Sequence, residues 1–343
     1  MAKKMLVCKI SLLLLLVLAV FLILLRKNTP DKEECLHAKD RFDCYESYYK
    51  KIVESKGVGL AVMDLKSEYA NNSFIRSQCH QMMHIIGRAA ADSQKNVSKA
   101  FMEGDPFCWS GYYHGVMEGT LMDYEIKSIP GKINEICKDV TGKKQYSFDY
   151  YNCAHGLGHG IMYINNHEVF DSLKICDYLN GSYEQSSCWG GVFMENVMVN
   201  FKDHFTKYLK PEDPLYPCDA VDAKYKATCY LMQTSYMLKV TAGNFSKVFQ
   251  LCSKIGDKYR DSCYQSIGRD ASGTSLSNPQ ATKEKCALGK NQRQQSNCII
   301  GAVKDFISYF HSDKQANEFC SILKPELRQI CFETGDSYYK AFN

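Results

Sequence analysis

Apolar residues recur every three or four positions along most of the chain, which is the spacing of helices that bury one face. Residues 244–254 and 314–324 show the pattern clearly, with Phe, Val, Ile and Leu separated by Lys, Asn and Gln. Sustained alternation of apolar and polar residues, which would indicate strands, is sparse. The pattern therefore predicts an all-α protein.

Most cysteines form pairs that are close in the sequence, and these pairs divide the chain into units. The close pairs are Cys35–Cys44, Cys137–Cys153, Cys176–Cys188, Cys218–Cys229, Cys252–Cys263, Cys286–Cys298 and Cys320–Cys331. Cys79 and Cys108 have no near partner, so they either pair with each other or stay free. The second cysteine of each pair opens a segment of similar composition, and from Cys229 onward these segments recur every 33 to 35 residues.

A period of this length is typical of one helical hairpin per unit. We predict disulfide-pinned helical-hairpin repeats, stacked as an α-solenoid or α/α superhelix, with each disulfide joining the end of one helix to the start of the next. A closed loop of this size contributes roughly 2–4 kcal/mol to stability. In period and cysteine placement the units resemble TPR-like and Sel1-like helical repeats, but the consensus residues of those two families are absent.

The N-terminus carries an apolar run over residues 6–25, interrupted only by Lys9 and Ser11. The run is about long enough to cross a bilayer as a helix, and no A-x-A-like cleavage site follows it. We therefore predict a signal anchor, or transmembrane helix, over residues 1–27. The chain would then be a single-pass membrane protein with its bulk outside the cytosol. A cleaved signal peptide is the alternative.

The composition agrees with an extracytoplasmic location. The chain has 17 cysteines, which indicates an oxidising compartment. Four Asn-x-Ser sequons, at Asn71, Asn96, Asn180 and Asn244, are compatible with a glycoprotein. The net charge of +4 comes from the basic residues of the expected anchor, and acids balance bases elsewhere. This balance argues against a nucleic-acid partner.

The predicted domain organisation has four segments. Residues 1–27 form the anchor, and residues 28–75 form a stem and the first disulfide hairpin. Residues 76–204 are rich in His and Gly, whereas residues 205–343 carry the regular cysteine-paired repeats. Three of the eight prolines fall within residues 210–217, which marks the clearest internal boundary.

Five of the nine histidines lie in three short segments of the His-rich region, and each segment has two potential metal ligands four residues apart. The pairs are His80 with His84, His114 with Glu118, and His155 with His159. Four residues make about one helical turn, so the side chains of a pair point the same way. We predict that these six residues bind a divalent transition metal (Zn, Fe, Mn or Cu), with room for two ions. Non-covalent haem held by two histidines is an alternative.

A single histidine in a helix is more often a hydrogen-bonded core residue than a ligand. Here the pattern repeats in register, because His114 and His159 each lie six residues after a cysteine. Glycines beside the histidines, such as Gly115 and Gly158, cost about 1 kcal/mol each inside a helix. They therefore indicate either a close approach of neighbouring helices or room for a ligand.

Glu118 and Glu195 are the predicted catalytic residues, as general bases where they are not ligands. The sequence predicts a metal-dependent hydrolase or oxidase without choosing between them, because no His-Glu-x-x-His or Gly-x-Ser-x-Gly motif is present. The alternative is a non-catalytic α-solenoid scaffold whose repeat surface binds peptide or protein partners.

Overall fold

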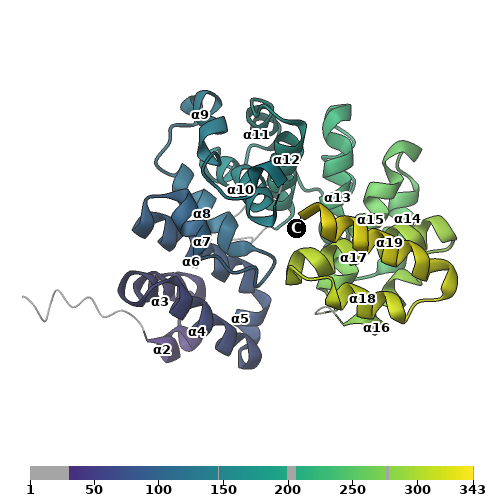
Figure 1. The fold of residues 1–343 in the computed structure, drawn as a ribbon, viewed down its shortest axis with the longest axis horizontal. Helices are drawn as coiled ribbons and strands as arrows, with labels where there is room; N and C mark the ends of the chain where they lie inside the picture. The colour runs from purple at the N-terminus through teal and green to yellow at the C-terminus, as the bar shows by residue number, and fades with distance from the viewer. Residues whose placement is uncertain (1–30, 146, 199–205, 276–277, 343) are drawn as a thin grey trace, which may run out of the picture.

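The structure is a computed structural model, and it describes residues 31–145, 147–198, 206–275 and 278–342. Within these residues the chain is helical and has no strand; a single isolated β-bridge joins Lys210 and Asp213. The prediction of an all-α protein is therefore confirmed. The helices form an N-terminal and a C-terminal half, which lie side by side (Figure 1).

The helices of the N-terminal half are α2 (Lys32–His37), α3 (Arg41–Lys56), α4 (Val58–Asn71), α5 (Ser73–Ser77), α6 (Cys79–Gln94), α7 (Val97–Met102), α8 (Gly111–Leu121), α9 (Ile129–Ile136), α10 (Phe148–Ile164), α11 (Val169–Cys176) and α12 (Ser182–Val197). Two 3-10 turns accompany them, η1 (Ile126–Ser128) and η2 (Lys143–Gln145). The C-terminal half consists of α13 (Ala223–Val240), α14 (Phe245–Ser253), α15 (Asp257–Gly273), α16 (Pro279–Cys286), α17 (Gln292–Phe310), α18 (Lys314–Ser321) and α19 (Pro325–Phe342).

The long helices pack in chain order. Each long helix contacts the next one in the series α6, α8, α10, α12, α13, α15, α17 and α19. Short helices such as α11 and α18 pack beside their long neighbours. The proline-containing residues 210–217 lie in the connection between α12 and α13. A regular α-solenoid or superhelical repeat stays a prediction, as does the division of the chain into four segments.

Two aromatic contacts join the halves to each other. The Trp109 ring, just before α8, lies 5.4 Å from the ring of Tyr309 on α17. The ring of Phe148, at the start of α10, stacks on His311 at 4.4 Å. The helical array therefore turns back on itself, and the end of α17 meets the starts of α8 and α10.

The disulfide prediction is confirmed for the eight cysteine pairs that the structure describes, including Cys79–Cys108. Their Cα–Cα distances lie between 5.3 Å and 6.0 Å, which suits a disulfide. In the C-terminal half, Cys252 near the end of α14 joins Cys263 inside α15. The disulfides thus hold short helices against the long ones.

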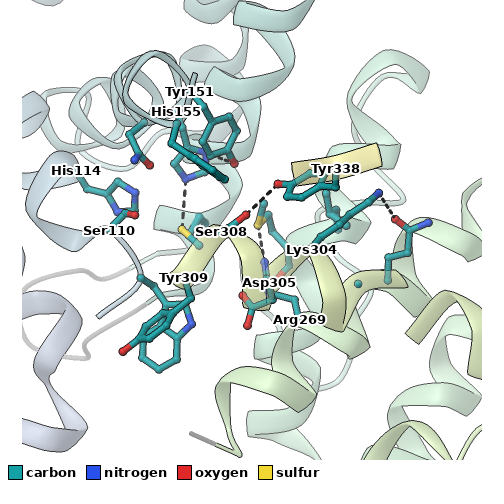
Figure 2. A pocket seen from close by; sticks show the side chains of 18 residues that line it. Ser110, His114, Tyr151, His155, Arg269, Lys304, Asp305, Ser308, Tyr309 and Tyr338 are labelled. Carbon is teal, nitrogen blue, oxygen red and sulfur yellow. Dashed lines mark hydrogen bonds between the residues drawn. The ribbon is translucent and has the colours of Figure 1, made fainter. Parts of the chain in front are cut away.

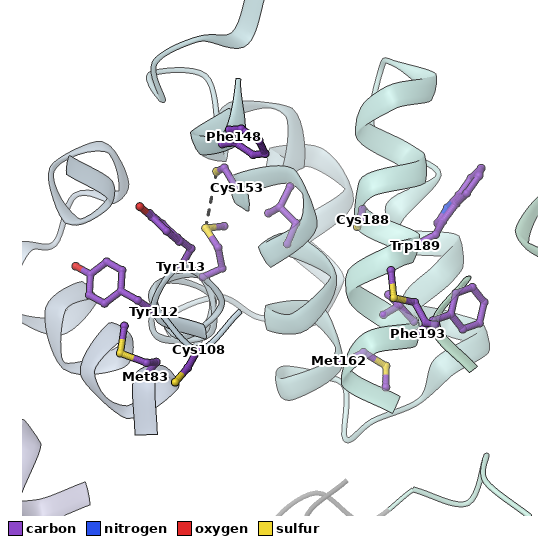
Figure 3. Packing of buried hydrophobic residues seen from close by; sticks show 14 of the residues in the cluster. Met83, Cys108, Tyr112, Tyr113, Phe148, Cys153, Met162, Cys188, Trp189 and Phe193 are labelled. Carbon is purple, nitrogen blue, oxygen red and sulfur yellow. Dashed lines mark hydrogen bonds between the residues drawn. The ribbon is translucent and has the colours of Figure 1, made fainter. Parts of the chain in front are cut away.

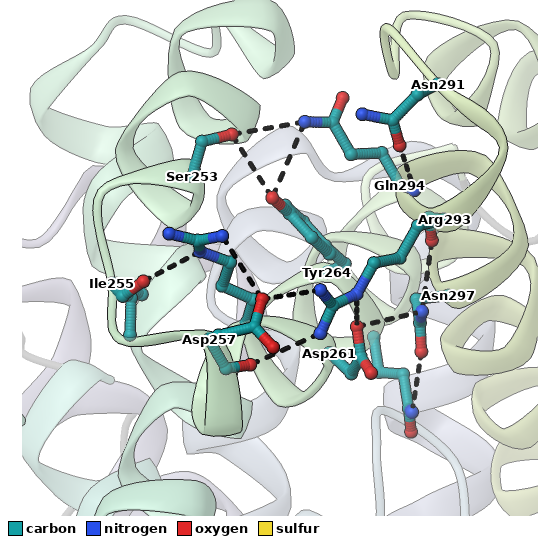
Figure 4. A network of polar contacts seen from close by, with 11 residues as sticks. Ser253, Ile255, Asp257, Asp261, Tyr264, Asn291, Arg293, Gln294 and Asn297 are labelled. Carbon is teal, nitrogen blue, oxygen red and sulfur yellow. Dashed lines mark hydrogen bonds and ion pairs between the residues drawn. The ribbon is translucent and has the colours of Figure 1, made fainter.

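Aromatic residues, methionines and cystines fill the core between the long helices, as Figure 3 shows for α8, α10 and α12. Polar contacts add to this packing near the surface of the C-terminal half (Figure 4). The Arg293 guanidinium donates to the Asp257 carboxylate at 2.6 Å and to the Asp261 carboxylate at 2.7 Å. These side chains are largely exposed, so the ion pairs contribute little to the stability of the protein and mainly orient α15 against α17.

Glycines allow the long helices to approach closely. A Cβ at Gly268 of α15 would overlap the Cys298 carbonyl of α17, and a Cβ at Gly301 would overlap the Gln265 carbonyl. The same kind of contact joins Gly115 to the His84 backbone and Gly191 to the His155 backbone. Of the two explanations for these glycines, close helix approach is the one that these contacts support.

The predicted localisation as a single-pass membrane protein is corrected by the structure. Within residues 31–145, 147–198, 206–275 and 278–342, no helix is both long and apolar enough to cross a membrane. The anchor expected at residues 1–27, through which the chain would contact the membrane, lies outside the described residues. The disulfides still agree with an oxidising compartment.

The glycine contacts can be tested far from the histidines with Gly268→Ala. We expect this change to lower the free energy of unfolding by about 1–3 kcal/mol, because the new methyl group would push α15 away from α17. Gly59→Ala in α4 is the matched control: its added Cβ meets open space, so we expect no loss of stability. Urea unfolding of the oxidised proteins measures both. Equal stabilities of the two variants would contradict the close approach.

Candidate metal centre

The structure brings the six predicted ligands together in the interior of the N-terminal half. They lie on three neighbouring helices: His80 and His84 on α6, His114 and Glu118 on α8, His155 and His159 on α10. All six are buried, with at most 5% of each residue exposed. Their donor atoms form three overlapping groups, and within each group the atoms lie within 4.8 Å of one another. One residue links each pair of groups, so the residues form a single cluster.

His80 and His84 point toward each other at one end of the cluster. The His80 Nδ1 lies 2.8 Å from the Cys108 carbonyl oxygen, and the His84 Nδ1 lies 2.6 Å from a Glu118 carboxylate oxygen. Since both of these oxygens accept hydrogen bonds, each Nδ1 carries the proton. The two remaining nitrogens, both Nε2, face each other at 2.9 Å.

The same arrangement occurs a second time between α10 and α12. The His159 Nδ1 lies 2.7 Å from a Glu195 carboxylate oxygen, and His155 hydrogen-bonds to the backbone of Ser187. The Nε2 atoms of these two histidines face each other at 3.3 Å. Glu195, predicted from the sequence as a catalytic residue, therefore has the same place beside His159 as Glu118 has beside His84.

His114 joins the two histidine pairs. Its ring stacks on the His159 ring with a centroid distance of 4.0 Å, and its Nδ1 lies 3.4 Å from the His80 Nε2. Four nitrogens bound tetrahedrally at about 2.0–2.1 Å from one zinc-sized ion would lie roughly 3.3 Å apart. Two separations in the cluster, 3.3 Å and 3.4 Å, are close to this value, so its nitrogens could share a metal ion.

Burial keeps several of these rings neutral. It lowers the pKa of His80 to about 3, with a further contribution from neighbouring His84. Burial also lowers the pKa values of His114 and His155 well below the usual range, and the nearby His159 adds to both shifts. Neutral imidazole is the form that binds metals. The His80 Nε2 is consequently a buried lone pair directed at another imidazole nitrogen.

Arg88 is a member of the site that the sequence analysis missed. Its guanidinium donates to the second Glu118 oxygen at 2.7 Å and to Glu46 of α3 at 3.1 Å. Burial alone would raise the pKa of Glu118, but His84 and Arg88 outweigh burial and lower this pKa. Glu118 is thus an ionised carboxylate with both oxygens occupied. The only sequence signal was that Arg88 lies one helical turn after His84.

Met194 was also missed. Its sulfur lies 3.4 Å from the His155 Nε2, on the side of the ring that faces the cluster. Met194 follows Cys188 by six residues, the same offset that places His114 and His159 after their cysteines. That register could have identified it. A thioether adds a soft ligand to the imidazoles.

The backbone before α8 is strained next to the site. Cys108, Trp109 and Ser110 have φ values of 55°, 56° and 59°, which is the left-handed region that side chains other than glycine disfavour. The Cys79–Cys108 disulfide and the contact between Trp109 and Tyr309 hold this turn in place. The strain is therefore balanced by contacts that direct the Cys108 carbonyl at His80.

A pocket of about 180 Å³ lies beside the cluster, between the two halves of the protein. His114 and His155 form part of one wall, and residues of α15, α17 and α19 form the wall opposite (Figure 2). Most of the lining is aromatic or apolar, but Arg269, Lys304 and Asp305 also contribute to it. These three residues could not be linked to the site from the sequence, because they lie more than 100 positions from the histidines of the cluster.

The lowered histidine pKa values predict how the stability of the metal-free protein depends on pH. Between pH 6.5 and about 3, the unfolded chain binds a proton at His80 that the folded chain does not. Folding stability therefore rises with pH across this window and falls on acidification, by up to about 1.4 kcal/mol per pH unit for each such imidazole. Urea unfolding of chelator-treated protein, from neutral pH through this window, measures the slope.

His80→Asn is expected to reduce this slope, because the variant lacks the imidazole that titrates on unfolding. His37→Asn serves as the control, since His37 is exposed and far from the cluster in sequence. A slope that is the same in the wild type and in His80→Asn would contradict the assignment of a neutral, buried His80.

Comparison with known proteins gives no relative for this chain. No protein-family model matches it, and neither a curated protein nor a solved structure is similar to it. The protein is helical, with buried His and Glu groups that could hold a metal ion.

Proposed function

We propose that this protein is a metal-dependent enzyme that acts on a small molecule in the pocket beside the histidine cluster. His80, His84, His114, His155 and His159 would hold one or two divalent transition-metal ions. Glu118 and Glu195 would orient two of these histidines, in the way that carboxylates behind metal-bound histidines commonly do.

One observation carries the metal proposal: Nε2 atoms face each other twice, at 2.9 Å and 3.3 Å. Two lone pairs at this distance repel each other unless a proton or a metal ion lies between them. A shared proton would create an imidazolium beside Glu118 or Glu195, and the lowered pKa values of His80 and His155 oppose that charge on these two rings only. A metal ion would satisfy both pairs of nitrogens.

Oxidation is the reaction class that the donor atoms favour. Several imidazoles with a nearby thioether, here that of Met194, suit copper better than magnesium, calcium or manganese. Copper would supply the redox chemistry, with dioxygen as the oxidant. The protein's own residues would hold the ion, keep the imidazoles neutral and shield the site from water. The proposed enzyme is therefore an oxidase.

Hydrolysis is the second candidate, because of Asp305. This residue lines the same pocket and is only 8% exposed. Burial raises its pKa to about 7, against smaller opposing effects of Ser272 and Arg269. A carboxylate with this pKa is suited to act as a general base at neutral pH. A protein that bound only zinc would favour this candidate. The scaffold function, with peptide or protein partners, remains an alternative without a specific observation in its favour.

Elemental analysis of the purified protein tests the metal site. We expect about one to two metal ions per chain, and almost complete loss of the metal from the double variant His84→Ala/His159→Ala. His37→Ala should keep the wild-type metal content. Circular dichroism checks that each variant is folded, and an absorption spectrum separates copper, iron and haem. A folded wild-type protein that takes up no ion from zinc, copper or iron solutions would contradict the proposal.

Met194→Leu tests the choice of metal, because it keeps the volume of the side chain and removes the sulfur. We expect this variant to bind Cu(I) roughly 10-fold more weakly, while its affinity for zinc stays unchanged. Competition with a coloured chelator measures both affinities. Met162→Leu is the matched control, since Met162 is buried on α10 and, unlike Met194, does not line the pocket. Equal Cu(I) affinities for wild type and Met194→Leu would remove the argument for copper.

A further inference from the structure

Lys304 of α17 brings an uncompensated positive charge to the pocket. Its ammonium donates to the Gln265 side-chain oxygen at 3.2 Å and lies 5.9 Å from the Tyr338 ring. Among the described residues, no carboxylate forms an ion pair with it. Burial lowers the pKa of Lys304, so the charge would gain from an anionic partner.

The other cation of this wall is already neutralised. The Arg269 guanidinium pairs with Asp270 at 3.0 Å and donates to the Ser235 hydroxyl at 2.7 Å. Asp305 follows Lys304 in the chain and is buried, and one of its oxygens has no hydrogen-bond partner among the described residues. The wall therefore offers one free positive charge and, beside it, one acidic group with an unused oxygen.

The rest of the pocket limits the kind of anion. Aromatic side chains, including Trp109, Tyr309 and Tyr338, form much of its lining, so the body of the ligand must be apolar. A phosphate dianion would require more than one free cation or several donors, whereas Lys304 is the pocket's only cation without an ion pair among the described residues. A carboxylate carries a single charge, and its second oxygen could accept a hydrogen bond from protonated Asp305.

We propose that the pocket binds a small carboxylic acid with an apolar or aromatic body, and that Lys304 selects for its carboxylate. The ligand would lie with this group at α17 and with its body toward His114 and His155, on the opposite side of the pocket (Figure 2). The inference rests on the proposed function, since it names the substrate class for the same site. Lys304 is thus a specificity-determining residue of the pocket.

Intrinsic fluorescence tests this proposal, because the chain has two tryptophans and only Trp109 lines the pocket. Trp189 packs against Tyr225 at 5.0 Å instead, so a Trp189→Phe background leaves Trp109 as the sole reporter. The ligands to titrate are phenylacetate, phenylacetamide, phenethylamine and phenyl phosphate, which share one ring. We expect phenylacetate to bind at least about 10-fold more tightly than the other three.

Lys304→Met should abolish this preference, Lys304→Arg should keep it, and Lys290→Met, a change at an exposed lysine, should leave it unaltered. Circular dichroism confirms folding, and Lys304→Gln replaces Lys304→Met if the latter unfolds. Equal binding of phenylacetate and phenylacetamide would overturn the inference, as would tighter binding of the amine or the phosphate. Preference for phenylacetate that survives in the folded Met or Gln variant would also overturn it.

The titrations are carried out on metal-loaded and on chelator-treated protein, with metal content measured on the same samples. This design separates the inference from the proposed function. Metal uptake without a Lys304-dependent preference overturns the inference alone. A preference in protein that never binds metal overturns the proposed function, whereas a preference in both forms supports the inference independently of any bond between carboxylate and metal.

Discussion

The close approach of neighbouring long helices is the constraint on which the whole site depends. Gly115 lies against the His84 backbone and Gly191 against the His155 backbone, where a Cβ would overlap a carbonyl group. Imidazole side chains are short, so rings from adjacent helices can meet only when the backbones come this near. The same contact occurs at Gly268 and Gly301, where no histidine is present. The glycines therefore belong to the fold, and the histidines make use of a geometry that the fold provides.

The site also has an internal duplication. The helix pair α6 and α8 directs the His84 Nδ1 at Glu118, and the pair α10 and α12 directs the His159 Nδ1 at Glu195. In both cases a partner histidine, four residues earlier, uses a backbone carbonyl to fix its own ring. Because these carboxylates and backbone groups bind the other side of each ring, the Nε2 atoms point toward the centre of the cluster. Orientation of the rings is thus determined by two backbone groups and by the carboxylates of Glu118 and Glu195.

Much of this was accessible from the sequence because it depends on local spacing. The i, i+4 pairs placed His80 beside His84 and His155 beside His159, and the cysteine register gave the disulfides of the described units. That helices from different units place their histidines at one point was a hypothesis from the repeated spacing, because the spacing within one helix does not determine the distance between helix axes. The sequence also could not distinguish Arg88 from other helical arginines, because Arg88 acts by donating a hydrogen bond to Glu118, which lies 30 positions away.

The pocket was the least predictable part for the same reason. Lys304 and Asp305 face the histidine cluster across the pocket only because the array turns back on itself, where Trp109 contacts Tyr309. No periodicity in the sequence encodes that curvature. The regular, histidine-poor repeats of the C-terminal half suggested a separate scaffold, yet their helices form one wall of the pocket.

The contact between Trp109 and Tyr309 has a consequence for the order in which the protein assembles. The helices that carry the histidines and their carboxylates are consecutive in the chain, so their contacts close short loops and form early. The contact between Trp109 and Tyr309 joins residues 200 positions apart, so it can form only after almost the entire polypeptide has been made. During biosynthesis, the imidazoles of His114 and His155, which line the pocket, are therefore reachable from solvent before the far wall arrives. Entry of a metal ion would be easiest in that interval, before the far wall narrows the path to the cluster.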